Sequence, residues 1–106
     1  MARTRLRRST GNVFRDLGFG PEEAASLKIR AELMIEIERL MKRRRLTQAA
    51  AGKLLGVTQP RVSDLVRGKI ELFSIDTLVD MLTRAGVQVR INIRRSHGRA
   101  KDAKAA

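Results

Sequence analysis

The chain has 106 residues and a formal net charge of +12 at pH 7, which suits a single domain with a polyanionic partner. It contains no Cys, Trp or Tyr and one His, which excludes disulfides and Cys-based zinc sites and argues against recognition of single strands by base stacking. Duplex DNA is therefore the expected polyanion, and no metal or other cofactor is expected. The basic N-terminus lacks the apolar segment of a signal peptide, and no apolar run approaches membrane-spanning length, so we expect a cytoplasmic protein.

Both ends of the chain are predicted to be disordered. Residues 1–12 are rich in Arg and offer little to bury, and residues 95–106 are polar and low in bulky apolar side chains. The basic arm is either a solvated tail or a segment that follows the phosphates or enters a minor groove, as basic arms do. The folded part is expected to be residues 13–94.

A short apolar cluster precedes Gly20 and Pro21. It consists of Val13, Phe14, Leu17 and Phe19. Two interpretations remain open: these side chains cap the core of the domain, or they form a binding motif for a partner protein.

Residues 21–44 have a strongly helical pattern, because apolar side chains recur at every fourth position. This row is Ala25, Ile29, Leu33, Ile37 and Met41. Glu22 and Glu23 suit the first turn of a helix, and the cationic residues 42–45 suit its last turn. The cationic cluster either compensates the helix dipole or lies close to the phosphate backbone of bound DNA.

The segment Thr47–Lys69, TQAAAGKLLGVTQPRVSDLVRGK, is interpreted as a helix-turn-helix. Gln48–Leu55 is expected to form the first helix, and Gly56 stands where the chain must turn with a positive φ. Thr58 is expected to cap the second helix, Gln59–Arg67, by accepting a hydrogen bond from an amide in its first turn.

The second helix is expected to end before Gly68 and to present two different faces. Val62, Leu65 and Val66 are apolar at helical spacing and should face the core. The opposite face carries side chains that can contact bases and phosphates: Gln59, Arg61, Ser63, Asp64 and Arg67.

Arg61 is the predicted guanine contact, because an Arg can donate two hydrogen bonds to the O6 and N7 atoms of one guanine. A phosphate contact by Arg61 is the alternative. Arg67, Lys69 and residues 42–45 are expected to supply phosphate attraction that does not depend on sequence.

After the helix-turn-helix, Ser74 is a good N-cap for a further helix that extends to about Ala85. The following sequence VQVRINIRR alternates apolar and polar residues, which predicts a strand with one apolar face. The apolar residues are Val87, Val89, Ile91 and Ile93. A lone strand leaves its backbone groups unpaired, so we expect antiparallel pairing with the same strand of a second copy in a homodimer.

Such a dimer would present two DNA-contacting helices about 34 Å apart to a palindromic operator. Pairing of the strand with residues 12–14 of its own chain is the alternative. The expected fold is thus mostly α, a helix-turn-helix bundle of four to five helices with a C-terminal strand that pairs in a dimer.

The sequence resembles the Xre/Cro phage-repressor family over Leu46–Lys69, where LTQ, LGVTQ, VS and RGK are the family's anchor points. The resemblance implies that Gln48 contacts a phosphate. It also implies that four residues of the second helix face the major groove, namely Gln59, Arg61, Ser63 and Asp64. Thr58, the N-cap of that helix, is a further candidate for DNA contact. Ala51 and Gly52 depart from the family pattern, and we expect a loosely packed first helix that Gly weakens by about 1 kcal/mol.

The segment NVFRDLGF, the long helix before LTQ and the C-terminal strand together resemble the HigA-like antitoxins, over roughly residues 12–94. That resemblance implies binding of a RelE/ParE-like toxin and repression of the protein's own operon. The candidates for toxin contact are then Val13, Phe14, Leu17 and Phe19. A stand-alone Xre-family regulator without a toxin partner is the alternative.

Two other classes of function fit the sequence less well than a DNA-binding regulator. An enzyme is disfavoured, because the sequence offers no nucleophile and base set, no phosphate-binding glycine loop and no motif with paired carboxylates. A protein that only binds other proteins would leave the strong positive charge and the polar face of the second helix unexplained. A DNA-binding regulator accounts for both features.

Overall fold

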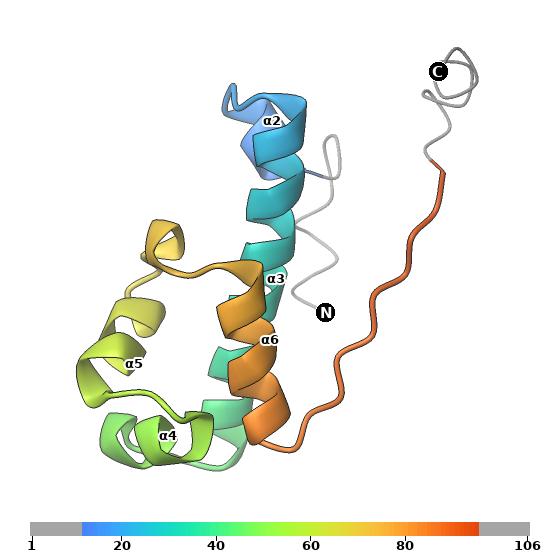
Figure 1. Ribbon diagram of the computed structural model, residues 1–106. Coiled ribbons are helices and arrows are strands. Elements are labelled where there is room, and N and C mark those ends of the chain that lie inside the picture. The colour runs from blue at the N-terminus through green and yellow to red at the C-terminus, as the bar shows by residue number, and fades with distance from the viewer. Residues whose placement is uncertain (1–11, 96–106) are drawn as a thin grey trace.

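The computed structural model describes residues 12–95 (Figure 1), and the predicted arm and tail at residues 1–11 and 96–106 lie outside these described residues. Within this range the fold is helical, as predicted. Its elements are α2 (Val13–Asp16), α3 (Pro21–Arg43), α4 (Gln48–Leu55), α5 (Gln59–Val66), the 3-10 helix η1 (Ile70–Leu72) and α6 (Ile75–Arg84).

The long helix α3 is the spine of the molecule. Pro21 occupies its first turn, where a missing N–H costs nothing, and Glu22 and Glu23 favour the positive end of the helix dipole. Figure 1 shows α2 at the N-terminal end of α3, α6 alongside its C-terminal half, and α4 and α5 at the far end. The helix-turn-helix thereby packs against the pair formed by α3 and α6.

A single core joins the C-terminal half of α3 to α4, α5 and α6. It contains Met34, Ile37, Leu40, Met41, Ala51, Leu55, Val62, Leu65, Phe73, Leu78, Met81, Leu82 and Ala85. Phe73 lies between η1 and α6 and is 1% exposed, so it is a central core residue. The core is what fixes α4 and α5 against the spine.

The predicted apolar face of α3 was wrong in its first half. Ala25 is exposed and Ile29 is 38% exposed, whereas Ile37 and Met41 are buried. A step of four residues advances about 40° beyond one helical turn, so a row with that spacing drifts around the helix. The residues buried in its place are Ala24, Leu27 and Met34.

The predicted helix caps are confirmed. The hydroxyls of Thr58 and Ser74 accept hydrogen bonds from backbone amides in the first turns of α5 and α6. Gly68 and Gly86 have φ values of +76° and +87° and follow the C-caps of the same two helices. These local signals fixed the bounds of α5 and α6 to within a residue or two.

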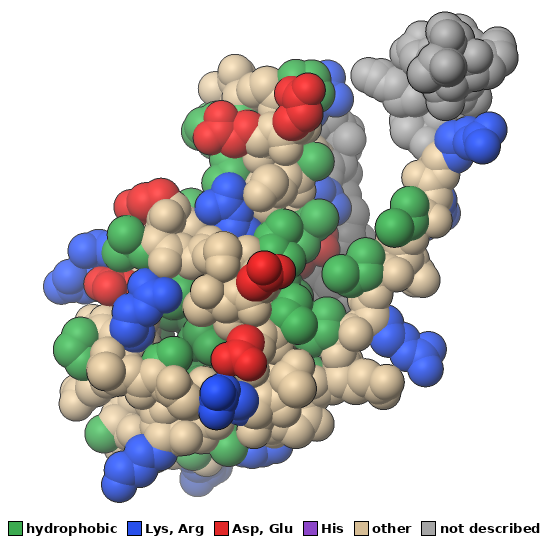
Figure 2. All heavy atoms as spheres, in the orientation of Figure 1, with side chains coloured by type: hydrophobic (Ala, Val, Ile, Leu, Met, Phe, Trp, Pro, Cys, Tyr) green, Lys and Arg blue, Asp and Glu red, His purple; other side chains and the backbone are tan. Residues whose placement is uncertain are grey.

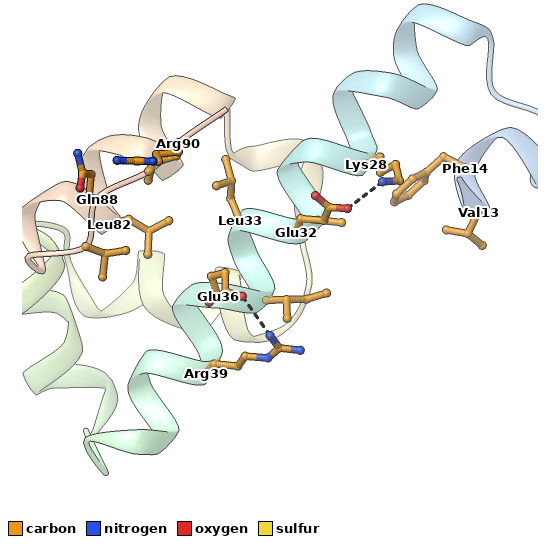
Figure 3. Close-up of a pocket in the computed structure, with 14 residues that line it drawn as sticks. Val13, Phe14, Lys28, Glu32, Leu33, Glu36, Arg39, Leu82, Gln88 and Arg90 are labelled. Atoms are coloured by element: carbon orange, nitrogen blue, oxygen red, sulfur yellow. Dashed lines mark hydrogen bonds and ion pairs between the residues drawn. The ribbon is translucent and has the colours of Figure 1, made fainter. Parts of the chain in front are cut away.

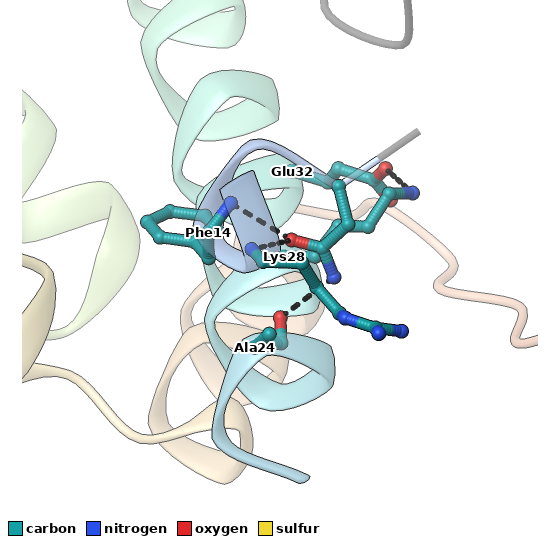
Figure 4. Close-up of polar contacts among 6 residues, drawn as sticks. Phe14, Ala24, Lys28 and Glu32 are labelled. Atoms are coloured by element: carbon teal, nitrogen blue, oxygen red, sulfur yellow. Dashed lines mark hydrogen bonds and ion pairs between the residues drawn. The ribbon is translucent and has the colours of Figure 1, made fainter. Parts of the chain in front are cut away.

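Asn12 belongs to the folded domain and not to the basic arm. Its carbonyl oxygen Oδ1 accepts from the amide of Phe14 at 3.0 Å, and its Nδ2 donates to the carbonyl oxygen of Ala24, also at 3.0 Å (Figure 4). The side chain therefore caps α2 and ties it to α3. The ring of Phe14 meets that of Phe19 edge-on, with centroids 6.1 Å apart.

The interpretation that the N-terminal apolar cluster caps the core was wrong. Val13, Leu17 and Phe19 are 46%, 69% and 41% exposed, and Phe14 is half-buried. None of the four belongs to the core cluster. Because α2 packs on α3 outside the core cluster, its apolar side chains lie on the surface.

The predicted strand over Val87–Ile93 is not formed, and residues 12–95 include no strand at all. A strand exists only as part of a ladder, and the alternative partner, residues 12–14, is the N-cap and start of the helix α2. Val87 and Val89 pack against the core, but Ile91 and Ile93 are 63% and 90% exposed. The predicted apolar face is thus half covered.

Candidate nucleic-acid interface

The turn between α4 and α5 depends on a close approach of the backbone at Gly52. A Cβ at this position would lie 2.7 Å from the carbonyl oxygen of Val57, which is closer than a carbon atom can come. The amide of Val57 in turn donates to the carbonyl oxygen of Gly52 at 2.9 Å. Ala51 beside it is fully buried. The expectation of a loosely packed α4 was therefore wrong, because small residues here permit tight packing.

Gly56 adopts the predicted left-handed conformation, with φ +76° and ψ +29°. It is followed by Thr58, whose hydroxyl accepts from the amide of Arg61 at 3.4 Å. At the start of α4 the hydroxyl of Thr47 accepts from the amide of Ala50 at 3.1 Å. Each helix of the motif thus begins at a defined residue, with its remaining free amides at the positive end of its dipole.

Helix α5 turns Val62 and Leu65 into the core, where they are 0% and 1% exposed. Val66 was predicted to join them but is 43% exposed, because α5 contributes only the narrow side formed by the other two residues. The surface of α5 is consequently wider than predicted. Gln59 and Arg67 are exposed on it, and Ser63 and Asp64 are half-buried.

Arg61 does not extend freely into solvent. Its guanidinium carbon Cζ lies 4.2 Å from the centroid of the Phe73 ring, and its Nη1 donates to the carbonyl oxygen of Leu72 at 3.1 Å. A cation over an aromatic face gains about 0.5–1 kcal/mol at an exposed site. The side chain is therefore held against the loop that follows α5.

A second arginine holds the same loop from the other side. Nη1 of Arg30 on α3 lies 3.4 Å from the carbonyl oxygen of Ile70 and 3.5 Å from that of Phe73. Sequence reasoning missed this residue, since it stands forty positions before the groups that it contacts and no local motif marks it. Arg30 and Arg61 together fix η1 relative to α3 and α5.

The other predicted DNA contacts lie at the starts and ends of α4 and α5. Lys69 Nζ is 3.8 Å from Oδ1 of Asp64, so these two side chains form an ion pair at the end of α5. Within the described part of the chain, the side chains of Gln59 and Arg67 make no hydrogen bond or ion pair. Gln48, the first residue of α4, is half-buried, and Thr58 is exposed.

The cationic cluster at residues 42–45 is exposed where α3 ends and the chain turns into α4. Arg45 has φ +52°, and it is the single residue other than glycine with a positive φ in residues 12–95. The amide of Arg45 bonds to the carbonyl oxygen of Lys42 and that of Leu46 to the carbonyl oxygen of Met41. This is a Schellman motif, which usually has Gly at the position that Arg45 occupies.

The interface region is strongly basic. Residues 44–69 contain six Lys or Arg and one acidic side chain, Asp64. Figure 2 shows Lys and Arg side chains around the end of the molecule that α4 and α5 form. The exposed start of α5 is therefore surrounded by cations, which is the arrangement that a helix needs in order to approach a polyanion.

Among the described residues no helix is long and apolar enough to cross a membrane, and no group of three His, Asp or Glu side chains is placed to hold a metal ion.

Comparison with known proteins agrees with this arrangement. Residues 13–94 match the family of a helix-turn-helix domain. The chain is similar to a solved structure described as a putative XRE family transcriptional regulator, with a TM-score of 0.65 and 35% sequence identity; the match covers 71% of this chain and 84% of that chain. No curated protein sequence matches the chain significantly.

Proposed function

The chain belongs to the helix-turn-helix family of XRE-type DNA-binding transcriptional regulators, and from this premise we propose that it is a repressor, and not an enzyme, that binds a palindromic operator. The observation that carries the proposal is the exposed polar side of α5, set in a segment of six cations and one acid. A helix of this kind enters the major groove with the residues of its first turns toward the base edges.

In this proposal Gln59, Arg61 and Ser63 face the major groove, and Arg61 contacts a guanine. In the free protein its guanidinium lies against the Phe73 ring and donates to the carbonyl oxygen of Leu72, and these contacts compete with the guanine contact. Gln48, Thr58 and Asp64 complete the contact surface suggested by the family resemblance.

The phosphates are proposed to be contacted at both edges of α5. Arg67 and Lys69 lie at its C-terminal edge, and the cluster at residues 42–45 lies at the start of the helix-turn-helix. These contacts position the protein and raise affinity for any duplex, while the base contacts supply specificity.

Selection of duplexes from a random pool tests the proposal. We expect enrichment of an inverted repeat, and Gln59→Ala should lose preference at one position in each half of it. Thr83→Ala, an exposed change on α6 away from α5, is the matched control and should leave the selected sequence unaltered. Recovery of a random pool with the wild-type protein would refute sequence-specific binding.

The inverted repeat follows from the proposal that the protein acts as a two-fold homodimer, in which two α5 helices lie one turn of DNA apart, about 34 Å. The support for a dimer is the C-terminal segment, where Ile91 and Ile93 are exposed although each is strongly apolar.

We further propose that the repressor is an antitoxin that neutralises a RelE/ParE-like toxin and represses its own operon. The observation that favours this role is the exposed apolar surface formed by Val13, Leu17 and Phe19 on and after α2, with Phe14 beside them. It lies at the opposite end of α3 from the helix-turn-helix, so toxin and DNA could be bound together. A stand-alone regulator is the competing proposal.

Co-expression with the product of a neighbouring RelE-like reading frame separates these two roles. We expect co-purification, which Leu17→Asp should abolish because Leu17 is 69% exposed and its change leaves the core intact. Asp16→Asn, on the same exposed turn, is the control that should retain the toxin. Absence of such a frame beside the gene, together with no binding, would leave the stand-alone regulator.

A further inference from the structure

A groove of about 420 Å³ runs along the outer face of α3, away from the helix-turn-helix (Figure 3). Val13 and Phe14 of α2 lie at one end of it, and Leu82, Gln88 and Arg90 lie on the opposite side. Two ion pairs follow the helix along the groove: Lys28 with Glu32 at 2.8 Å and Arg39 with Glu36 at 3.0 Å.

One wall of the groove is formed by an extended segment, and the backbone of this segment is not paired in a sheet. Val87 and Val89 pack against the core, and their side chains mark the face of the segment that looks toward α3. Within the described residues, the backbone from Gln88 onward is outside any helix or strand. It therefore offers an edge to which a second extended segment can pair.

Side-chain alternation restricts which segment can fill the groove. A segment paired antiparallel to Val87–Ile93 places each residue on the same face as the residue directly opposite. Its apolar residues must therefore alternate in the same phase as Val87 and Val89. The sequence Val87–Ile93 has that property, and its outer half, Ile91 and Ile93, is exposed in the single chain.

The distribution of charge decides where a second copy can dock. Two chains of net charge +12 repel each other, and the repulsion is strongest between the basic segments at residues 44–69. By contrast α3 carries five acidic and five basic side chains, so its charges cancel. Residues 86–95 carry three Arg and no acid, and a cationic segment is better placed along α3 than along the helix-turn-helix.

From these observations we infer that the groove is the docking site for the C-terminal segment of a second copy, exchanged reciprocally between two chains. This rests on the proposed homodimer and names its interface. The partner's Ile93 lies beside Val89 and fills the groove over Ala31 and Ile35, so the pocket of each chain is completed by the other.

The register follows from charge and from where α6 ends. Apolar residues stay on one face only if the two-fold axis passes through a residue. An axis at Arg90 would set two Arg directly opposite each other, which is destabilising. An axis at Val89 would set Ile93 opposite Ala85, the C-cap of α6, where the backbone is not extended. An axis at Ile91 sets Arg90 opposite Asn92 and Val89 opposite Ile93. The strand predicted from the sequence thus forms only between chains, with its centre at Ile91.

Sedimentation equilibrium of the full chain and its variants tests the inference. The wild type should sediment at twice its chain mass of 11.9 kDa. Ile93→Asp should sediment as a monomer with unchanged helix content and thermal midpoint, because Ile93 is 90% exposed and supports nothing within its own chain. Asn92→Asp adds the same charge one residue away on the other face, and it should remain a dimer.

A second pair of variants examines the groove itself. Ala31→Arg fills the groove and should produce a monomer, whereas Ala25→Arg, at an exposed position of the same helix that does not line it, should not. Since the chain has no native Cys, Ile91→Cys can be oxidised alone, and a disulfide-linked dimer is expected from it but not from the exposed control Thr83→Cys.

A wild-type monomer at high micromolar concentration, or a dimer that survives both Ile93→Asp and Ala31→Arg, would overturn the inference. Measurement of DNA binding shows whether the proposed interface or the proposed repressor function has failed. If these variants are monomers but the wild-type dimer selects no sequence, the interface stands and the repressor proposal fails. If the wild type selects an operator but is a monomer with and without it, the interface fails and the repressor proposal stands.

Discussion

The guanidinium carbon of Arg61 lies 4.2 Å from the centroid of the Phe73 ring. This contact joins a residue in the first turns of α5 to the end of the loop that follows the same helix. Together with the hydrogen bond from Arg61 to the carbonyl oxygen of Leu72, it makes the helix and the loop one unit. An arginine expected to contact DNA thus also contributes to the fold.

Arg61→Ala should lower the free energy of unfolding by about 1–2 kcal/mol in the absence of DNA, through loss of the ring contact and one hydrogen bond. Urea unfolding followed by circular dichroism measures this. Arg67→Ala removes a similar but exposed side chain and should change stability by less than about 0.5 kcal/mol. Equal stabilities of the two variants would show that the ring contact contributes nothing.

The same Arg61→Ala variant should relax specificity at one position in each half of the operator. A bidentate arginine contact to guanine is worth about 1–3 kcal/mol of discrimination. Competition titrations with operators mutated at single positions measure it. Uniform weakening on every sequence would instead assign Arg61 to a phosphate or to the loop alone.

Gly52→Ala should destabilise the protein, although Ala favours a helix by about 1 kcal/mol over Gly. The added Cβ would lie 2.7 Å from the carbonyl oxygen of Val57, so the turn before α5 must shift. We expect a lower thermal midpoint and weaker DNA binding. Ala50→Gly is an exposed change in the same helix. It should lower stability only by the difference in helix propensity between Ala and Gly, and it should leave DNA affinity unchanged. A more stable Gly52→Ala protein would contradict the close approach.

Arg45→Gly should stabilise the fold by about 1 kcal/mol, because a left-handed conformation costs an ordinary residue about 1–2 kcal/mol and costs Gly little. Arg44→Gly is the matched control: Arg44 has φ −93°, where Gly gives no relief and only adds freedom to the unfolded chain. Differential scanning calorimetry of the two proteins distinguishes them. A stabilised Arg45→Gly protein that binds DNA less tightly would indicate that the strained arginine is kept for its charge.

Replacement of all four residues from Lys42 to Arg45 by Ala should flatten the salt dependence of DNA binding. Each lost phosphate contact lowers the log–log slope by about 0.9 for B-form DNA. Arg15→Ala, at the other end of α3, is the control and should leave the slope unaltered. An unchanged slope in the fourfold variant would place the cluster on the side of the protein away from DNA.

The sequence predicted those parts of the fold that local chemistry determines. Thr58 and Ser74 fix the starts of α5 and α6, and Gly68 and Gly86 follow their ends, because caps act within a few residues. The sequence alone therefore locates the helix-turn-helix. Its DNA contacts stay predictions, because the bases that a side chain contacts depend on how the helix docks in the groove.

What the sequence did not predict depends on contacts between distant segments. The close approach of Gly52 to Val57 is set by how α5 packs on the core. The sequence predicted that this glycine weakens α4, whereas the close approach requires a residue without a Cβ. Arg30 reaches the carbonyl oxygen of Ile70 only because the fold places α3 next to the loop that contains Ile70. The strand failed for a related reason: alternation in Val87–Ile93 describes a segment suited to pairing, but it cannot supply the partner.

The separation of charge along the molecule also affects how fast the protein finds DNA. Residues 44–69 hold six cations and one acid at one end of α3, whose own five acidic and five basic side chains cancel, so charge is unevenly distributed over the described part of the chain. In the field of a duplex such a molecule rotates before contact, so that most encounters begin with α5 already facing the groove. The association rate constant should therefore fall with rising salt more steeply than net charge alone would require.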